Sequence, residues 1–362
     1  MKKFTFFTIT AFLFVTILSF TPGPAMAGSH EKPVLLKVPI AFPTKLPGLG
    51  STIKWVSERI ETASGGSVKM KVYEPKKLIA PFEILSAVSK GKVNAGYSTA
   101  GYWRGKLPAA AIFSAIPFGP EAGEYLAWLW YGNGMKLYQQ MYDDAGYNVK
   151  VLLCGIIAPE TSGWFKEPIT SAKQLDGMKM RFFGLGGAAM NKLGVQTSLL
   201  PSGEIFPALE KKAIDATEFS MPAIDQLLGF HKIAKYNYFP GWHQQATTFE
   251  LLINKKTWNG MSDHQRMVIE MMCYAATADC FAYTEAIQGA VIRENAEKRG
   301  VKNMYWSDDM LATFRGAWDE LREEQYKNDA FFAKVWDDFS EFHKNYAFWS
   351  SLGFLPRPKP PK

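Results

Sequence analysis

Arg181 and two glutamates, Glu160 and Glu218, are the residues of this sequence best suited to hold a small anion. Arg181 ends an alternating run, Met178–Arg181, and a glycine-rich turn follows it. A guanidinium binds a carboxylate through two parallel charged hydrogen bonds. We therefore predict that Arg181 grips a carboxylate, although the ordinary role of such a residue is a surface ion pair.

The two glutamates suggest a cation next to this arginine. Glu218 follows the expected strand start 214–217, which puts it at the same sheet edge as Arg181; a helix cap or an ion pair is its alternative role. Glu160 and Gln244 flank the two segments where the chain is expected to cross between lobes. Because two carboxylates near one arginine repel each other, we expect a hard cation with oxygen ligands to join them.

Aromatic residues make up 14% of the chain, and one adjacent pair stands out. Tyr102 and Trp103 follow a strand expected at 93–98. They are candidates for the wall of a cleft, with an ordinary core or surface position as the alternative.

Motifs of known catalytic sites are missing from this sequence. It has no nucleophile elbow, no paired-histidine metal helix and no phosphate-binding loop. Gly184–Ala189 matches a dinucleotide-binding pattern, but the preceding strand alternates with charges, whereas that fold needs a continuous apolar strand. These glycines better suit the approach of a small anion to a helix N-terminus. We expect the five histidines to be surface or core residues: His30, His231, His243, His264 and His343.

Short strands and helices alternate along the first two thirds of the chain. We expect strands at 34–42, 67–73 and 93–98 and helices at 50–62 and 82–90. Strands separated by helices of this length indicate βαβ units and a largely parallel sheet.

The chain is expected to form two α/β lobes, crossing near Val151–Ala158 and returning near Gln245–Leu252. Lobe 1 then covers residues 28–153 with a return segment at about 248–300, and lobe 2 covers 154–247.

The last third of the chain is helical. Ser262 begins a capping box, and the helix it opens is expected to run to Arg299 and stop at Gly300. Ser307 is expected to cap a second helix, reaching about Tyr346. Helices this long, in the C-terminal region 301–362, are expected to brace both lobes, a partner subunit, or both.

Residues 1–27 have the pattern of a secretory signal peptide. Lys2 and Lys3 precede an apolar run from Phe4 to Phe20, and Ala25–Ala27 is a small-x-small cleavage site. Cleavage there leaves a chain that begins at Gly28 and functions outside the cytoplasm. We therefore expect an exported, periplasmic protein.

The charge and the cysteine spacing exclude two further classes, nucleic-acid-binding proteins and zinc proteins. Removal of two lysines from the 41 Lys+Arg leaves a net charge of 39 − 34 = +5, with no basic block typical of nucleic-acid binding. Cys154, Cys273 and Cys280 have no zinc-site spacing, and we expect three buried thiols.

Three motifs in this order resemble the solute receptors of tripartite ATP-independent periplasmic (TRAP) transporters: Lys179–Arg181, Ala216–Glu218 and Pro240–Trp242. The similarity runs from about Val34 into the C-terminal helices. The chain resembles in particular the subfamily that binds 2-oxo and 2-hydroxy monocarboxylates with a metal ion. The resemblance implies an α/β, two-lobe periplasmic binding protein fold with mixed, mostly parallel sheets and long C-terminal helices bridging the lobes.

The resemblance also implies roles for individual residues. The residue matching Arg181 grips the ligand carboxylate, and the residue matching Glu218 binds the cation together with the backbone oxygen of the next residue, here Phe219. That aromatic is usually Trp in the family, so this pocket wall is smaller. The family commonly has Gln at the position of Glu160 and an acid at that of Gln244. Both are expected to contact the metal and the substrate, with Tyr102 as a further wall residue.

Charge balance then favours one metal. Glu160 and Glu218 together carry −2, so a divalent cation neutralises them, whereas Na⁺ leaves the closed site negative. We expect Ca²⁺, with Na⁺ as the alternative. The resemblance further implies delivery to TRAP membrane permease subunits and a possible homodimer through the C-terminal helices. An exported metal-dependent enzyme acting on a 2-oxo acid, and the same fold serving an ATP-driven importer or a sensor, remain alternatives.

Overall fold

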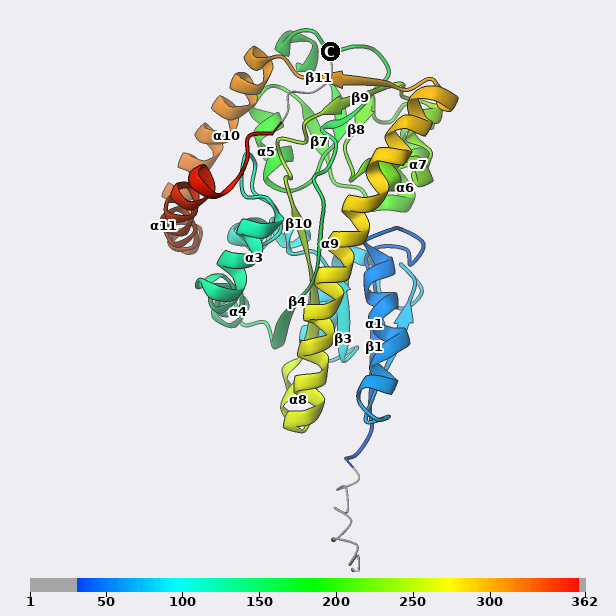
Figure 1. Cartoon of the computed structure of the whole chain (residues 1–362), viewed down its shortest axis with the longest axis vertical. Coiled ribbons are helices and arrows are strands. Elements are labelled where there is room, and N and C mark those ends of the chain that lie inside the picture. Colours follow the sequence, from blue (N-terminus) through cyan, green and yellow to red (C-terminus); the bar gives the residue numbers. More distant parts are fainter. Residues whose placement is uncertain (1–30, 358–362) are drawn as a thin grey trace, which may run out of the picture. The chain divides into compact units, whose positions relative to one another are not determined.

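The computed structural model describes residues 31–357, where helices and strands alternate as expected (Figure 1). The predicted signal peptide, residues 1–27, lies outside these described residues. From residue 31 to residue 357, no helix combines the length and the apolar character needed to cross a membrane.

A βαβ unit opens the described chain. β1 (Val34–Pro39) and β2 (Val68–Tyr73) pair in parallel, and α1 (Gly50–Ala63) connects them. α1 buries residues at helical spacing, Ile53 and Val56 among them, because one apolar stripe of an amphipathic helix must face a core. These bounds follow the predicted ones closely.

A three-stranded sheet contains the two segments where the chain was expected to cross between lobes. β10 (Thr247–Asn254) lies between β3 (Ala95–Ser98) and β4 (Val149–Ile157) and is antiparallel to both. All residues of β10 are buried. Antiparallel pairs are thus more frequent than predicted, because β4 and β10 run in opposite directions.

A six-stranded mixed sheet forms the centre of the second lobe. Its strands, in order, are β11 (Lys302–Tyr305), β9 (Tyr236–Phe239), β5 (Gly163–Phe165), β8 (Ala216–Thr217), β6 (Lys179–Arg181) and β7 (Gln196–Ser198). β6 is parallel to both of its neighbours, with Arg181 opposite Thr217. This register brings Arg181 next to Glu218, the residue that follows β8.

Short helices complete the two lobes. The α-helices are α2 (Ile84–Ser89), α3 (Ala122–Tyr131), α4 (Gly134–Asp144), α5 (Gly184–Lys192), α6 (Ser202–Glu210), α7 (Pro222–Leu228) and α8 (Lys255–Asn259). The 3-10 helices are Pro81–Glu83, Ala100–Trp103, Pro108–Phe113, Ala172–Leu175 and Phe230–Lys232.

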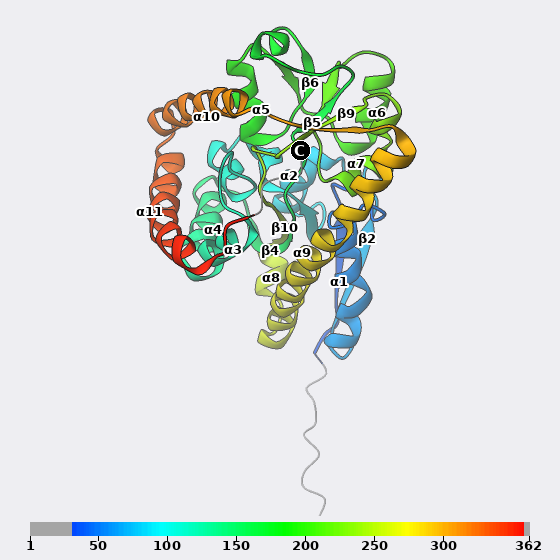
Figure 2. The ribbon, with the colours of Figure 1, turned by 45° about the horizontal axis from the view of Figure 1, so that its top comes forward.

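One long helix contacts both lobes. α9 (Asp263–Arg299) begins at the predicted capping box of Ser262 and ends at Gly300, whose φ of 67° suits a helix stop. It contacts α1 and β4 in the first lobe and α7 in the second (Figures 1 and 2). The predicted bridging helix is therefore present.

The second C-terminal helix was predicted as one element and is two. α10 (Asp308–Asn328) ends at Asp329, which is extended and caps α11 (Ala330–Gly353) by accepting a hydrogen bond from the backbone N–H of Phe332. α10 contacts α5 of the second lobe, whereas α11 contacts α3 and α4 of the first (Figure 2). The pair spans both lobes through the break at Asp329.

Candidate functional site

A buried pocket lies at the ends of β6 and β8, against the strand β10. Its cavity volume is about 20 Å³, far below the range of about 300–1,000 Å³ that is typical of ligand pockets. Half of its lining is aromatic or aliphatic and half is polar. The lining residues are Phe42, Leu49, Thr99, Tyr102, Glu160, Arg181, Phe183, Phe219, Ser220, Gln244, Thr247 and Phe249.

Arg181 is the last residue of β6, and only 1% of it is exposed. Its Nη1 donates to the backbone oxygen of Glu218 at 2.8 Å and lies 3.0 Å from Glu218 Oε2. Its Nε donates to the backbone oxygen of Leu200, and its guanidinium carbon lies 4.9 Å from the ring centre of Phe219. Within residues 31–357, Nη2 has no hydrogen-bond partner, so Arg181 keeps one donor group for a ligand.

Glu218 follows β8 and is completely buried. Its Oε2 accepts from Arg181 and, at 2.9 Å, from the backbone N–H of Phe183. Burial raises the pKa of Glu218, but Arg181 and His243 outweigh it, so the pKa is lowered overall. Glu218 is therefore the ionised carboxylate of the site.

Glu160 and Gln244 lie together although 84 residues separate them. The backbone N–H of Glu160 donates to the backbone oxygen of Gln244 at 3.1 Å. Gln244 Nε2 donates to Thr247 Oγ1 at 2.6 Å, and Thr247 Oγ1 donates to Glu160 Oε1 at 3.1 Å. Burial, then the charges of Glu218 and Asp225, raise the pKa of Glu160 well above its ordinary value.

His243 belongs to the same cluster, although the sequence predicted an ordinary surface or core residue. Its Nε2 lies 3.6 Å from Glu218 Oε1 and 3.8 Å from Glu160 Oε2, too far for hydrogen bonds. A side chain on Gly186 would put a Cβ atom 2.6 Å from that of His243. Gly186 thus lets α5 approach His243, which accounts for this glycine without the anion predicted there. The position of His243 next to Gln244 was the signal in the sequence that could have placed it in this cluster.

The donor set of this cluster fits a metal ion. Glu160 Oε2, Glu218 Oε1 and Gln244 Oε1 are buried without a hydrogen-bond partner in the described chain. Ligand atoms of the two carboxylates and of His243 lie within 4.8 Å of one another. Because an unsatisfied buried polar atom is costly, these three oxygens suit contact with a cation. Two carboxylates and an amide oxygen are ligands that hard cations prefer.

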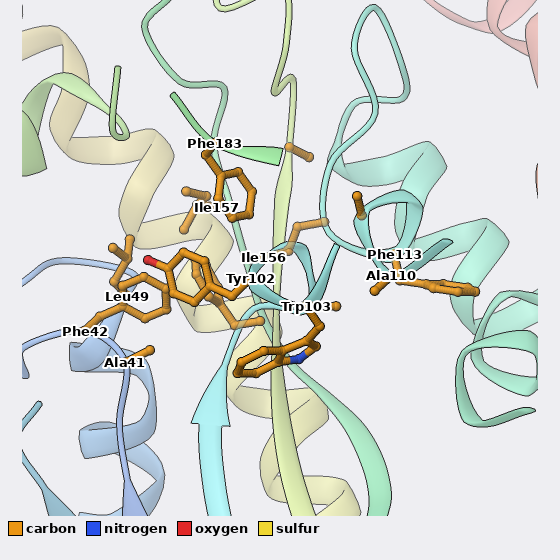
Figure 3. Close-up of a cluster of buried hydrophobic side chains, with 14 of the residues drawn as sticks. Ala41, Phe42, Leu49, Tyr102, Trp103, Ala110, Phe113, Ile156, Ile157 and Phe183 are labelled. Atoms are coloured by element: carbon orange, nitrogen blue, oxygen red, sulfur yellow. The ribbon is translucent and has the colours of Figure 1, made fainter. Parts of the chain in front are cut away.

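An aromatic wall closes the other side of the pocket. Tyr102 lies with its ring centre 5.5 Å from that of Phe183 and 5.7 Å from that of Phe42 (Figure 3). Burial raises the pKa of its hydroxyl group. Trp103, the other member of the predicted pair, does not line the pocket. Phe42 and Phe183 were not predicted from the sequence, because a single buried Phe has no distinguishing pattern.

The chain is similar in sequence to known bacterial proteins. The family model "Bacterial extracellular solute-binding protein, family 7" matches residues 45–329. A monocarboxylate 2-oxoacid-binding periplasmic protein of Nostoc sp. is 31% identical over 300 residues, which cover 83% of this chain and 82% of that protein.

Solved structures of TRAP solute-binding proteins share the fold. The Bordetella bronchiseptica protein, a dimer with calcium and picolinate in one site, has a TM-score of 0.86 and 26% identity over 89% of this chain and 95% of its own. The Pseudoalteromonas atlantica protein, with sodium and pyruvate, has a TM-score of 0.85 and 27% identity over 89% and 97%.

These similarities confirm the predicted two-lobe fold and the predicted receptor class, and nothing in them supports the enzyme alternative. The family is extracytoplasmic by its description, in agreement with the predicted export. The chain therefore belongs to family 7 of the bacterial extracellular solute-binding proteins, the solute receptors of TRAP transporters.

Proposed function

We propose that this receptor binds a small 2-oxo or 2-hydroxy monocarboxylate together with a metal ion and delivers it to a TRAP membrane permease. The Nostoc relative is named for monocarboxylate 2-oxoacids, and the Pseudoalteromonas structure contains pyruvate. The small pocket supports a short ligand. Its aromatic wall supports a monocarboxylate, since a second carboxylate there would be buried without a partner.

The observation that carries the proposal is a buried arginine that shares one pocket with unpartnered oxygens. Arg181 is fixed by Glu218 and by Leu200 and retains Nη2 for the ligand carboxylate. A fixed guanidinium loses little side-chain freedom on binding, which favours affinity. Phe219 under the guanidinium and Tyr102 on the opposite wall exclude water from this contact.

Glu160, Glu218, Gln244 and the backbone oxygen of Phe219 are the proposed metal ligands. The metal supplies positive charge for the ligand carboxylate and its 2-oxygen. Arg181 balances one of the two glutamates, so with a bound carboxylate the site carries −2 before the metal is counted. We favour Ca²⁺ over Na⁺, since a divalent ion brings this buried charge to zero. Metal analysis of the protein purified from its host identifies the ion.

A thermal-shift assay tests the receptor proposal. Pyruvate or lactate with Ca²⁺ should raise the Tm of the wild type, because a ligand at 100 times its Kd stabilises the folded state by about 2.7 kcal/mol. Arg181→Lys should abolish most of this shift while the protein stays folded, since an ammonium group keeps the charge but cannot form two parallel bonds.

Arg59 provides the matched control, because it is exposed and does not line the pocket. Arg59→Lys should shift as the wild type does. A wild type that no small 2-oxo or 2-hydroxy acid stabilises would overturn the proposal, as would an Arg181→Lys variant with an unchanged shift.

We also propose a homodimer formed through the C-terminal helices. The end of α11 exposes apolar side chains, with Phe348 and Leu352 each 72% exposed and Leu355 92% exposed. Such exposed apolar surface is typical of an interface, and the Bordetella protein crystallised as a dimer. Native mass spectrometry should give twice the chain mass. The N-terminal sequence of the purified protein should start at Gly28 if the signal peptide is cleaved as predicted.

A further inference from the structure

A buried glutamate outside the pocket connects the core of the first lobe to the pocket wall. Glu250 is completely buried on the central strand β10. Its Oε1 accepts from Trp103 Nε1 at 2.7 Å, and its Oε2 accepts from Tyr138 Oη at 2.5 Å and Tyr142 Oη at 2.7 Å. A carboxylate has no donor of its own, so these three groups satisfy it. Burial raises the pKa of Glu250, and these three hydrogen bonds oppose the shift because they favour the charged form.

The three donors come from two different places. Tyr138 and Tyr142 lie on α4, away from the pocket lining. Trp103 ends the 3-10 helix 100–103, in which the preceding residue, Tyr102, forms part of the pocket wall. Figure 3 shows both rings leaving this turn, with Tyr102 directed toward Phe42. Glu250 thus holds the turn from the side opposite to the ligand.

The same turn is also the contact surface for the second lobe. A Cβ atom on Gly101 would lie 2.2 Å from Phe183 Cζ, so backbone and ring are in close contact. Phe183 in turn donates its backbone N–H to Glu218. A shift of the turn therefore moves both the Tyr102 wall and the surface on which Phe183 rests.

We propose that Glu250 is a positioning residue for ligand binding: through Trp103 it fixes the turn 100–103, and with it Tyr102 and the contact with Phe183. This inference rests on the proposed function of the pocket. Glu250 does not line the pocket, so its effect on affinity must pass through Trp103. The adjacent β10 residues Thr247 and Phe249 do line it.

The test compares variants that change either the donors or the acceptor in the hydrogen bonds to Glu250. Trp103→Phe keeps an aromatic ring but removes the indole N–H, and Glu250→Gln weakens the acceptor. Each should lower the affinity for pyruvate in the presence of Ca²⁺ by about tenfold, because each weakens the hydrogen bond between Trp103 and residue 250 that fixes the turn. Isothermal titration calorimetry, at a temperature where circular dichroism shows each variant folded, measures this.

The matched control is the double variant Tyr138→Phe/Tyr142→Phe, which removes two donors from the same carboxylate but leaves the turn attached. Its Tm should fall at least as much as that of Trp103→Phe, while its pyruvate affinity stays within about twofold of the wild type. A purely structural role would make affinity follow stability across all variants, and this result would overturn the inference.

The outcomes also separate this inference from the proposed function. If the wild type binds pyruvate and the Trp103→Phe and Glu250→Gln variants bind it with unchanged affinity, only the role of Glu250 is overturned. A wild type that binds no small monocarboxylate overturns both. Loss of affinity in these two variants, but not in the tyrosine control, supports the positioning role.

Discussion

Glu160 and Glu218 are the same type of side chain in one buried cluster, yet their surroundings shift their pKa values in opposite directions. Burial and the charges of Glu218 and Asp225 raise the pKa of Glu160. Burial also acts on Glu218, but Arg181 and His243 lower its pKa overall. In the metal-free protein Glu160 therefore keeps its proton to a higher pH than Glu218 does.

This difference predicts a pH-dependent metal affinity. A cation that binds Glu160 must displace its proton, so below the raised pKa each bound ion releases about one proton. The apparent Ca²⁺ affinity should then rise by up to about tenfold per pH unit as the pH approaches the raised pKa of Glu160 from below. Glu160→Gln has no proton to release and should flatten this slope. Calorimetric titration with Ca²⁺ across this range measures it; an equally steep slope in the variant would refute the assignment.

At the level of single residues, the sequence was informative where secondary structure fixed the direction of a side chain. Arg181 and Glu218 were found because parallel strands bring their carboxyl ends to one edge. His243 and Thr247 were not, because their place depends on the meeting of segments near residues 160 and 244, and no local period describes such a contact. Resemblance, rather than geometry, connected Gln244 with the metal.

The helix α7 shows how one buried acid can attach an element to its sheet. Asp225 lies in the first turn of α7, and its Oδ2 accepts from Trp164 Nε1 of β5 at 2.7 Å. Its Oδ1 has no hydrogen-bond partner among the described residues. Burial, opposed by the bond from Trp164, raises the pKa of Asp225 to about 8. The folded protein therefore favours the protonated acid.

The sign of the resulting stability effect follows from linkage. A folded-state pKa above the unfolded value of about 3.9 gives a contribution that is complete below pH 3.9 and is lost as the pH rises through about 8. Within that window the wild type should lose up to about 1.4 kcal/mol of unfolding free energy per pH unit through Asp225. Asp225→Asn removes this loss and keeps an acceptor for Trp164. It should be more stable than the wild type at pH 8, with an advantage that shrinks toward pH 4.

Urea denaturation at several pH values measures the effect of Asp225→Asn. Asp319→Asn, a change at an α10 residue whose side chain is about half exposed, is the control and should follow the wild-type profile. Parallel pH profiles for the wild type and Asp225→Asn would show that Asp225 does not titrate in this window.

Helix bounds were predictable where the sequence contains a capping motif, and not elsewhere. Ser262 and Gly300 mark both ends of α9, because a capping box and a left-handed glycine have local signatures. The break at Asp329 was missed, since an Asp inside a run of helix-forming residues is also tolerated at an exposed helical position. Only the packing of α10 on one lobe and α11 on the other reveals the need for a break.

At the scale of the whole molecule, local periodicity could not place the lobes. The sheet β3-β10-β4 pairs strands about 100 residues apart, and its antiparallel order was not expected from alternating strands and helices. The sequence pattern indicated two lobes and the resemblance to TRAP receptors implied the same arrangement, which the solved structures confirm. The predicted lobe boundaries at residues 153 and 247 remain predictions.

An exposed ion pair connects the two lobes at one point of their contact. Lys76, in the loop after β2, lies with its Nζ 2.6 Å from Oε1 of Glu204 in the first turn of α6. Both side chains are largely exposed, 59% and 44%. Exposed pairs contribute little, and salt screens them. Because this pair joins the lobes, even a small contribution should favour the closed state over the open one.

Glu204→Gln should therefore speed ligand release without changing the pocket. At low salt the dissociation rate of pyruvate should rise by up to about fivefold, the limit for an exposed pair of about 1 kcal/mol. At 1 M salt it should fall toward the wild-type rate, since the screening length of about 3 Å there is close to the Nζ–Oε1 distance of 2.6 Å. Stopped-flow displacement measures both rates.

The matched control is Glu61→Gln. It removes a similarly exposed pair, Lys69 to Glu61 at 2.7 Å, which lies within one βαβ unit. If Glu61→Gln speeds release as much as Glu204→Gln does, or if the effect of Glu204→Gln persists at high salt, the ion pair between the lobes does not hold the receptor closed.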